Sequence, residues 1–187
     1  MTKKQLRAVY KTRRSELSEA QIQNYSLQIA NLALDLPIWN YSFFHVFLTI
    51  KSLKEVNTEP LLAILSGKDK HIVISKADFK AQSMAHVLLQ DNTIIRLNSK
   101  RIPEPENGIE IKDKQLEVVF IPLMAFDTLG NRIGYGKGFY DVFLKNCADT
   151  TVKIGLSLFE AEALTIDTES HDISLDYCVT PNKIYKF

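Results

Sequence analysis

Hydrophobic positions recur every three to four residues along the first part of the chain, which is the spacing of an amphipathic helix. This period covers residues 3 to about 16, a basic segment that we predict to be the first helix. A second helix is predicted to begin after Ser18, because Gln21 follows three positions later and completes a capping-box signal. Pro37 is expected to stop that helix.

The pattern then changes to dense apolar runs typical of buried strands. Residues 41–50 are rich in aromatic and β-branched side chains, and residues 71–75 form a second such run. Between them, Thr58 is the expected N-cap of a helix that ends at Gly67. Strand, helix and strand in this order predict a βαβ unit with parallel pairing.

The middle of the chain is less regular. Residues 84–90 and 93–98 are each predicted to be strands, joined by a turn at Asp91 and Asn92. The proline-punctuated residues 101–108 are interpreted as a loop. This part therefore predicts a hairpin followed by an irregular connection.

The last part of the chain returns to alternating strands and helices. The most apolar run, residues 116–126, is predicted to be a central strand, and a glycine-rich stretch follows it directly. Residues 138–147 have helical spacing, and residues 152–159 have the composition of a strand. Residues 177–187 are interpreted as a terminal strand or hairpin.

This alternation decides the expected fold class. It predicts an α/β protein, a three-layer α/β/α single domain with a mostly parallel central sheet. The domain is expected to cover residues 1–187, with the helical segment 1–36 packing on the α/β core. The composition, 45% hydrophobic and 24% charged residues, is that of an ordinary globular chain of this length.

Composition also narrows the function classes. The formal net charge of +1 argues against nucleic-acid or anionic-membrane binding. No apolar run approaches the ~20 residues of a membrane span, and the N-terminus lacks the apolar region of a signal peptide. Cys147 and Cys178 have no metal-ligand spacing, so we expect two inert thiols. The expectation is a cytoplasmic monomer whose partners are small molecules.

A glycine-rich segment has the most informative chemistry. The sequence GNRIGYGKGFYDVFL begins at Gly130 and ends at Leu144, between a predicted buried strand and a predicted helix. Ligands of open α/β sheets bind beyond the carboxyl ends of the strands, where glycines let the backbone approach a phosphate. Arg132 and Lys137 add two cations, and Asp141 supplies a carboxylate suited to Mg²⁺ beside phosphate oxygens.

The spacing of this segment matches neither common phosphate-binding motif. Gly138 follows Lys137 where a P-loop has Ser or Thr, and the dinucleotide pattern G-x-G-x-x-G does not fit. A tight surface turn with a solvated lysine is the alternative interpretation. The strand–loop–helix context and the two cations favour an anion site.

The longer segment FIPLMAFDTLGNRIGYGKGFYDVFL closely resembles the signature of the 5-formyltetrahydrofolate cyclo-ligase family, also called methenyltetrahydrofolate synthetases. The matching positions are Pro122, Phe126, Asp127, Gly130, Arg132, Gly134, Gly136, Gly138, Tyr140 and Asp141. Three further segments resemble the family, namely KKQLRAVYKTRRSELS, FLTIKSLKEVNTEPLL and IPEP. The similarity therefore extends over nearly the whole chain.

The resemblance implies an enzyme that converts 5-formyltetrahydrofolate to 5,10-methenyltetrahydrofolate while ATP is hydrolysed to ADP and phosphate with Mg²⁺. In that family the formyl oxygen is phosphorylated, N10 attacks the activated carbon, and phosphate leaves. Such chemistry needs cations, backbone N–H groups and a metal rather than a protein nucleophile. The resemblance also implies a fold similar to those of phosphosugar isomerases and CoA transferases.

Roles for individual residues follow from the same resemblance. It implies catalytic roles for Arg132, Lys137 and Tyr140. The ATP-binding positions it implies are Lys3, Arg7, Arg132, Gly134, Gly136, Lys137, Gly138, Phe139 and Tyr140. The folate-binding positions it implies are Ile50, Glu55, Tyr135 and Tyr140. The metal ligands it implies are Asp141 and Asp176.

Residue types alone leave other interpretations open at several of these positions. Lys3 and Arg7 are also typical of a solvated helix face. Glu55 fits a solvated loop and Asp176 an ordinary strand start. A carboxylate at position 55 can, however, accept paired N–H bonds from the amino-pyrimidine ring of a pterin.

The chain departs from the family pattern at two places. Ser75 and Lys76 stand where the family often has Pro-Arg, and lysine lacks the bidentate fork of arginine. Lys100 and Arg101 precede the IPEP segment, where the family has an aromatic residue. None of the four histidines has an evident role.

Two other function classes stay open. A phosphosugar isomerase-like or CoA transferase-like enzyme of the same fold would use the glycine loop, Lys137 and a carboxylate for a sugar phosphate and for proton shuttling. A non-catalytic nucleotide-binding module is the other. Lys3, Arg7 and Arg132 favour a longer polyphosphate, and no general base is evident in the sequence.

Overall fold

The centre of the computed structural model, which describes residues 1–187, is a seven-stranded sheet in the order β11–β10–β9–β6–β1–β2–β3. Its strands are β1 (Phe43–His45), β2 (His71–Asp78), β3 (Ser83–Leu88), β6 (Val118–Pro122), β9 (Val152–Leu156), β10 (Tyr177–Val179) and β11 (Ile184–Lys186). Neighbours from β10 to β2 pair in parallel, whereas β11 and β3 pair antiparallel at the two edges. The prediction of an α/β protein with a mostly parallel sheet is confirmed.

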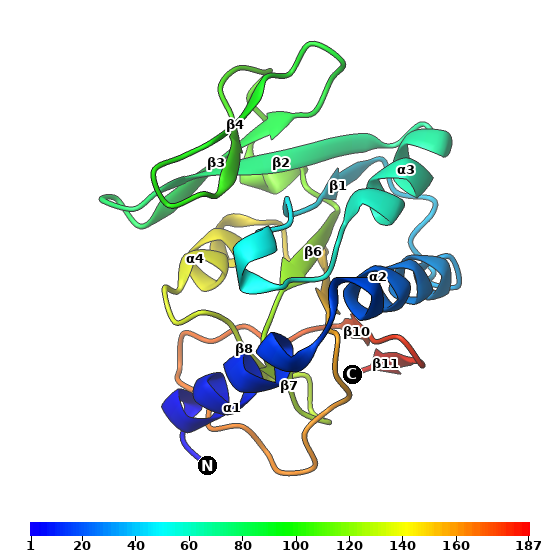
Figure 1. Cartoon of the computed structure of the whole chain (residues 1–187). Helices are drawn as coiled ribbons and strands as arrows, with labels where there is room; N and C mark the ends of the chain where they lie inside the picture. The colour runs from blue at the N-terminus through cyan, green and yellow to red at the C-terminus, as the bar shows by residue number, and fades with distance from the viewer.

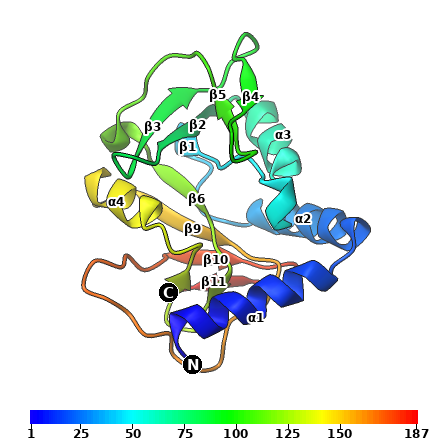
Figure 2. The same ribbon diagram turned by 60° about the vertical axis from the view of Figure 1, so that its left-hand side comes forward.

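Helices cover both faces of this sheet (Figure 1). α2 (Glu19–Ala33) and α3 (Glu59–Gly67) pack on one face, and α4 (Phe139–Asn146) packs on the other. α1 (Lys3–Glu16) lies across the lower end of the molecule (Figure 2), beside the short hairpin formed by β7 (Ala125–Phe126) and β8 (Arg132–Ile133). The three-layer arrangement is therefore confirmed.

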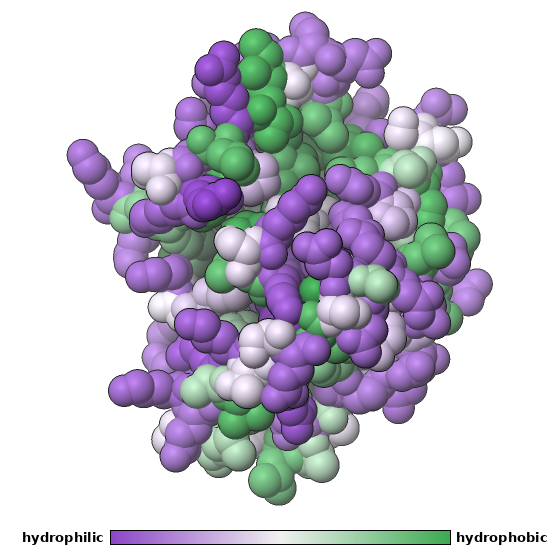
Figure 3. Space-filling model, in the orientation of Figure 1, coloured by the Kyte–Doolittle hydropathy of each residue, from purple (hydrophilic) through white to green (hydrophobic).

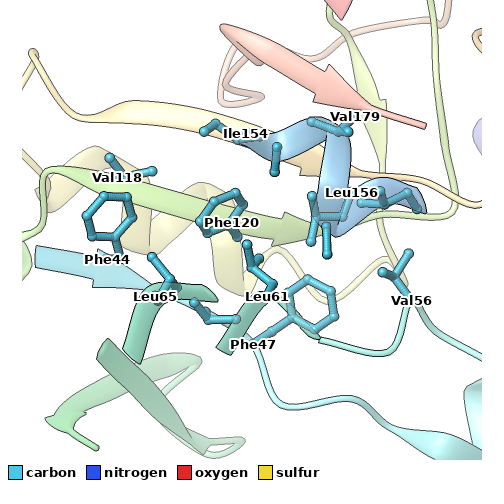
Figure 4. Close-up of a cluster of buried hydrophobic side chains, with 14 of the residues drawn as sticks. Phe44, Phe47, Val56, Leu61, Leu65, Val118, Phe120, Ile154, Leu156 and Val179 are labelled. Carbon is cyan, nitrogen blue, oxygen red and sulfur yellow. The ribbon is translucent and has the colours of Figure 1, made fainter. Parts of the chain in front are cut away.

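Strand β6 contributes to the core on both of its faces. Phe120 packs with Phe44 of β1 and Leu65 of α3 in the larger cluster (Figure 4). Ile121, the next residue, lies in the other cluster with Phe143 of α4. Successive side chains of a strand point to opposite faces, so a strand covered on both faces is apolar at every position.

The apolar run 116–126 nevertheless does not form one strand, contrary to the prediction. β6 ends at Pro122, and the Met124 N–H then donates to the Ile133 carbonyl at 2.7 Å in the β7–β8 hairpin. Proline cannot donate a ladder hydrogen bond, which makes it a typical end of a central strand. The chain therefore turns back on itself before it enters the glycine loop.

The predicted strand 41–50 is also too long. β1 contains only three residues, and the last ladder bond beyond it joins the Val46 N–H to the Val73 carbonyl at 2.9 Å. The chain then leaves the sheet and passes through a short 3-10 turn, Lys51–Leu53. The following residue, Lys54, has a φ of 47°, in the left-handed region. This departure from the sheet brings residues 47–55 to the site described below.

Helix starts agree with the sequence at one place and differ at another. The capping box of Ser18 and Gln21 is present as predicted. Thr58 precedes α3, but its side chain does not cap that helix. Its hydroxyl donates instead to the Phe47 carbonyl at 2.9 Å, while Asn57 Oδ1 accepts the Glu59 N–H at 3.1 Å.

The hairpin predicted from residues 84–90 and 93–98 is wrong. β3 pairs with β2 along the sheet edge, whereas β4 (Ile95–Leu97) pairs with β5 (Pro103–Pro105). β5 lies in the segment interpreted as a loop. Its prolines are tolerated because the ladder has only two strands, so one edge of β5 needs no donors.

The β4–β5 pair forms an arm at the top of the molecule (Figure 1). Its base is fixed to the main sheet by Glu104, whose Oε1 accepts the Ala77 N–H at 3.0 Å. Ile94, Ile95 and Leu97 are exposed on the arm, and Figure 3 shows hydrophobic surface at this end of the molecule.

The remaining predictions for the C-terminal part are largely confirmed. β9 lies within the predicted strand 152–159, and the last residues form the antiparallel β10–β11 hairpin. Cys147 and Cys178 are buried and unpaired, and burial raises the pKa of the Cys147 thiol to about 12. None of the helices combines the length and the apolar composition that a bilayer crossing requires.

Candidate active site

A cavity of about 1100 Å³ opens where β1 and β6 end. One wall, which we call the loop wall, comes from α1, the glycine loop and the start of α4. The other, the strand wall, comes from β2, β3 and residues 47–55. The predicted site residues that line it are Lys3, Arg7, Ile50, Glu55, Arg132, Gly134, Tyr135, Gly136, Lys137, Gly138, Phe139, Tyr140 and Asp141. Asp176 is the one predicted site residue that does not.

The glycine loop joins β8 to α4 and has an open backbone. Gly136 and Gly138 have φ angles of 84° and 69°, in the left-handed region that favours glycine. Gly138 is the N-cap of α4, and no side chain accepts hydrogen bonds from the first turn of that helix. Free N–H groups and the helix dipole make such a turn suitable for an anion.

Part of the signature around the loop is structural rather than chemical. Asp127 is fully buried, and its Oδ1 accepts the N–H groups of Leu129 and Asn131 at 2.9 and 3.0 Å. Gly130 has a φ of 82°, and a Cβ there would come within 2.8 Å of the Phe187 ring. These residues hold the turn that leads into the cavity wall.

α1 brings cations to the loop from the other end of the sequence. Arg7 Nε donates to the Gly134 carbonyl at 2.9 Å. Its guanidinium lies against Gly136, where a Cβ would come within 3.1 Å of Arg7 Cζ. Lys137 is exposed at the cavity and makes no ion pair within the chain. Gly136 is therefore needed both for its backbone conformation and for the close approach of Arg7.

Two carboxylates of this wall are each held by a cation. Arg132 Nη2 lies 2.7 Å from Asp141 Oδ1, which also accepts the Ile173 N–H at 3.2 Å. Lys3 Nζ lies 2.5 Å from Asp172 Oδ2. Partial burial alone would raise the pKa of Asp172, but the hydrogen bond from Lys3 lowers it below its ordinary value. The Asp172 carboxylate is therefore ionised near neutral pH.

Asp172 lines the cavity, whereas Asp176, which the family resemblance implies as a metal ligand, does not. The Asp176 carboxylate accepts the Lys153 N–H at 2.7 Å and lies 2.9 Å from Lys153 Nζ, outside the cavity lining. Both aspartates stand in the segment before β10, and only the path of the chain decides which one faces the cavity. The residue next to Asp172 is the one that donates to Asp141.

The opposite wall carries a buried carboxylate. Glu55 is 3% exposed, its Oε2 accepts the Ile50 N–H at 2.7 Å, and its Oε1 accepts the Tyr135 hydroxyl at 2.7 Å. Burial raises the pKa of Glu55, and these two donors partly offset that effect. The sequence interpretation of a solvated loop glutamate is therefore excluded, and Glu55, Ile50 and Tyr135 form one hydrogen-bonded group.

Arg14 anchors this group, and the sequence did not identify it as a site residue. It is 4% exposed on α1, and its guanidinium donates to the Tyr135 hydroxyl and to the Leu123 carbonyl, each at 2.6 Å. Its Nε has no partner. The sequence places Arg14 in a basic run, where a buried arginine cannot be distinguished from solvated ones. It orients Tyr135 without lining the cavity itself.

A second buried group lies behind the strand wall. His45 Nε2 is 2.6 Å from Ser75 Oγ, which is 3.1 Å from His86 Nδ1. His86 Nε2 is 3.3 Å from Asp113 Oδ1. The Tyr140 ring packs edge-on against His45, with ring centres 5.9 Å apart. Ser75 is the member of this group that lines the cavity.

The basic residues that depart from the family pattern lie apart from these groups. Lys76 is exposed and follows Ser75 on β2, so it projects to the opposite face of the strand and does not line the cavity. Lys100 Nζ lies 3.2 Å from the centre of the Phe79 ring, which packs edge-on against Phe139 at the cavity. Arg101 has a φ of 60° and also lies outside the cavity lining.

The donors of the cavity fit a polyphosphate with a magnesium ion. Mg²⁺ keeps several waters and takes one or two carboxylates together with phosphate oxygens. Asp141 and Asp172 are two such carboxylates beside an open glycine loop. No group of three or more His, Cys, Asp or Glu side chains converges to hold a metal by itself. The residues therefore suit a metal that arrives with a phosphate ligand.

Comparisons with known proteins give one consistent result. A family model described as the 5-formyltetrahydrofolate cyclo-ligase family matches residues 1–181. The 5-formyltetrahydrofolate cyclo-ligase of Mus musculus is 29% identical over 187 aligned positions, covering 93% of this chain and 91% of the relative. The enzyme of the same name from Escherichia coli K12 is 28% identical, covering 94% of this chain and 98% of the relative.

The fold has a counterpart among solved structures. The NMR structure of Aquifex aeolicus 5,10-methenyltetrahydrofolate synthetase superposes with a TM-score of 0.81. It is 24% identical in sequence, and the match covers 100% of this chain and 93% of that one. At this identity the likeness establishes the fold, which agrees with the family match.

Proposed function

Because the chain belongs to the 5-formyltetrahydrofolate cyclo-ligase family, we propose that it converts 5-formyltetrahydrofolate to 5,10-methenyltetrahydrofolate while ATP is hydrolysed to ADP and phosphate with Mg²⁺. One observation carries this proposal. The cavity places the cations of α1 and the glycine loop on one wall and the buried Glu55 carboxylate on the other. A polyphosphate and a pterin can thus meet in one enclosure.

The loop wall is the proposed ATP site. The backbone of Gly134, Gly136 and Gly138 lets the phosphates approach, and Phe139 and Tyr140 begin the helix behind them. Lys137 supplies an unpaired charge, while Lys3 and Arg7 bring charge from α1. Phosphoryl transfer depends on positioning and charge stabilisation, so these groups suffice without a protein nucleophile.

Asp141 and Asp172 are the proposed magnesium ligands. Arg132 and Lys3 hold them in place, at 2.7 and 2.5 Å. A bound Mg²⁺ neutralises charge on the transferred phosphoryl group. Arg132, which holds Asp141 in place, has a catalytic role in the same charge stabilisation. Asp176 has no part in this proposal because Lys153 occupies its carboxylate.

The strand wall is the proposed folate site. Glu55 is held by the Ile50 N–H and the Tyr135 hydroxyl, and a buried carboxylate can accept paired N–H bonds from the amino-pyrimidine ring. Phe47 and Leu48 give the same wall an apolar surface suited to a flat ring. Tyr140 stands between the two walls and positions the formyl group beside the phosphate.

The reaction then has two steps. The formyl oxygen attacks the γ-phosphorus and ADP leaves, which makes the formyl carbon electrophilic. N10 forms a bond to that carbon, loses its proton, and phosphate leaves with the electron pair of the C–O bond. Lys137 and Arg132 stabilise charge in the first step, as preorganised cations do in other phosphoryl transfers.

A direct assay tests this proposal. The protein is mixed with 5-formyltetrahydrofolate, Mg²⁺ and ATP, and methenyl absorbance is followed, with ATP or Mg²⁺ omitted as controls. We expect product only in the complete mixture. No ATP-dependent product would overturn the proposal. A second measurement is thermal unfolding in the presence of ligands. We expect MgATP to raise the melting temperature and sugar phosphates to leave it unchanged, whereas an isomerase-like site would be stabilised by sugar phosphates.

A further inference from the structure

The hydrogen-bonded group of His45, Ser75 and His86, with the Asp113 carboxylate beside it, has no part in the ATP and folate contacts proposed above. It spans from the cavity to the surface. Ser75 lines the cavity, and Asp113 at the other end is 24% exposed. Successive distances along it are 3.1 Å from Ser75 Oγ to His86 Nδ1 and 3.3 Å from His86 Nε2 to Asp113 Oδ1.

The sheet register builds this group. Ser75 of β2 and His86 of β3 are direct cross-strand partners, and β1 supplies His45. Phe143 of α4 covers both imidazoles, with ring centres 5.3 Å from His45 and 4.2 Å from His86. His45 and His86 are 0% and 1% exposed. The group is therefore dry except at its two ends.

The two histidines are neutral, which assigns the direction of each hydrogen bond. Burial lowers the pKa of His45 well below its ordinary value, and burial lowers that of His86 to about 4. His86 Nε2 makes no hydrogen bond and faces the Asp113 carboxylate at 3.3 Å, which favours the neutral tautomer with its proton on Nε2. That tautomer leaves Nδ1 to accept the Ser75 hydroxyl. His45 then donates from Nε2 to Ser75 Oγ. One consistent arrangement satisfies Ser75 fully and points its proton at His86.

Of the other carboxylates that line the cavity, Asp167 and Glu169 are exposed to solvent, and the buried or half-buried ones are engaged elsewhere. Glu55 accepts two hydrogen bonds, Asp141 is paired with Arg132, and Asp172 is paired with Lys3. Glu104 accepts the Ala77 N–H. The imidazole behind Ser75 thus gives the cavity a buried base, and an imidazole oriented by a carboxylate behind a hydroxyl is a common arrangement for proton removal.

We propose that Ser75 takes the proton that N10 loses in the cyclisation and passes its own hydroxyl proton to His86, with Asp113 stabilising the imidazolium. This inference rests on the proposed function. As N10 bonds to the formyl carbon, its N–H proton moves to Ser75 Oγ and the N–H electron pair stays on N10. The C–O bond to the phosphate breaks, and phosphate leaves with the electron pair of that bond. After product release the proton returns from His86 through Ser75 to water.

The test separates the two chemical steps in one turnover. Enzyme in excess over 5-formyltetrahydrofolate is mixed with MgATP, and ADP and methenyl product are quantified by rapid quench. We expect Ser75→Ala to slow methenyl formation about 100-fold, a usual contribution of general base catalysis, while ADP still forms at the wild-type rate. Ser75→Thr keeps the hydroxyl and is expected to restore methenyl formation.

Two further variants keep the test decisive. His86→Gln retains a hydrogen-bonding side chain but cannot take up a proton, so it is expected to reproduce the separation of ADP and methenyl rates. Ser83→Ala removes a hydroxyl from the same strand pair outside the cavity and is the matched control. Equal slowing of ADP and methenyl formation in Ser75→Ala, or no slowing, overturns the inference. A wild-type protein that makes no methenyl product overturns the proposed function instead.

Discussion

The two walls of the cavity are built on different physical principles. The loop wall has an exposed backbone at Gly136, an unpaired charge at Lys137, and partly solvated ion pairs such as that of Lys3 with Asp172. The strand wall holds polar groups that are almost completely buried, with His45, Glu55 and His86 at 0%, 3% and 1% exposure. Water solvates an exposed charge, whereas a buried polar group depends on hydrogen bonds to its protein partners.

This difference predicts how each wall responds to substitution. On the loop wall, removing a side chain changes ligand binding and leaves the free energy of unfolding nearly constant. On the strand wall, removing one hydrogen-bonding group leaves its partner buried and unsatisfied, so stability and function fall together. The substitutions below test that contrast, beginning with the largest expected effect.

Lys137→Ala is expected to have the largest effect on turnover. Loss of one preorganised charge at the transferred phosphate typically lowers kcat about 100- to 1000-fold. Since Lys137 is exposed and unpaired, we expect the free energy of unfolding to change by no more than about 0.5 kcal/mol, as for an ordinary surface substitution. Steady-state kinetics and thermal unfolding measure the two effects. Lys114→Ala, an exposed lysine outside the cavity, is the control.

Tyr135→Phe tests the strand wall. The change removes the hydroxyl that donates to Glu55 and accepts from Arg14, at 2.7 and 2.6 Å. A buried partner left unsatisfied costs about 1–3 kcal/mol, so we expect a lower melting temperature together with a higher KM for the folate. Tyr25→Phe, whose hydroxyl makes no hydrogen bond within the chain, should leave both unchanged. A normal melting temperature in Tyr135→Phe would contradict the contrast.

Gly136→Ala addresses the backbone of the loop wall. A φ of 84° costs an L-residue about 1–2 kcal/mol, and the new Cβ would meet Arg7 Cζ at 3.1 Å. We expect a modest loss of stability and a higher KM for ATP. Gly67→Ala, at the end of α3 and outside the cavity, is a matched control, since its φ is ordinary and no atom lies within 4 Å of the added Cβ. Similar ATP binding in both variants would count against the assigned role of Gly136.

The smallest expected effect is a pH dependence of stability from the buried histidines. Their native pKa values lie below that of the unfolded chain, about 6.5, so the unfolded state takes up protons first as the pH falls. Their contribution is therefore complete above about pH 6.5. It is lost between there and pH 4, with a slope of at most about 1.4 kcal/mol per pH unit for each histidine. Thermal unfolding from pH 7.5 to 5 measures it.

His86→Gln isolates this effect. The variant is expected to show a shallower fall in melting temperature with acidification than the wild type, while His71→Gln, an exposed histidine, keeps the wild-type slope. The groups that face His86 are Ser75, Asp113 and the His45 ring. Glu55, whose raised pKa acts in the opposite sense, contributes equally to both proteins. Identical slopes would show that the histidines do not titrate in this range.

Much of the loop wall was predictable because its residues are contiguous. Eight consecutive positions contain Gly134, Gly136, Lys137, Gly138 and Asp141. Their residue types predict a left-handed turn, a positive charge and a carboxylate. The surrounding strand and helix were equally visible in the hydrophobic pattern. Local conformation and local chemistry coincide here, so one segment predicts both.

The strand wall was not predictable for the opposite reason. Ser75 meets His86 only because β3 pairs with β2, and the sequence favoured a different hairpin partner for β3. Arg14 sits in a basic run, yet it is buried by contacts to residues 109 and 121 positions away along the chain. Long-range pairing has no local pattern, because any compatible strand edge satisfies the same backbone donors and acceptors.

The sequence by itself determined the α/β class, the parallel βαβ unit, the glycine-rich turn before α4 and the family to which the chain belongs. Each of these depends on periodicity or on residues close together along the chain. The tertiary structure decided which of two neighbouring aspartates, Asp172 or Asp176, faces the cavity, and that Glu55 is buried between Ile50 and Tyr135. It also joined Ser75 to a buried imidazole. These outcomes depend on where the chain leaves the sheet and on which groups lose contact with water, and packing alone settles both.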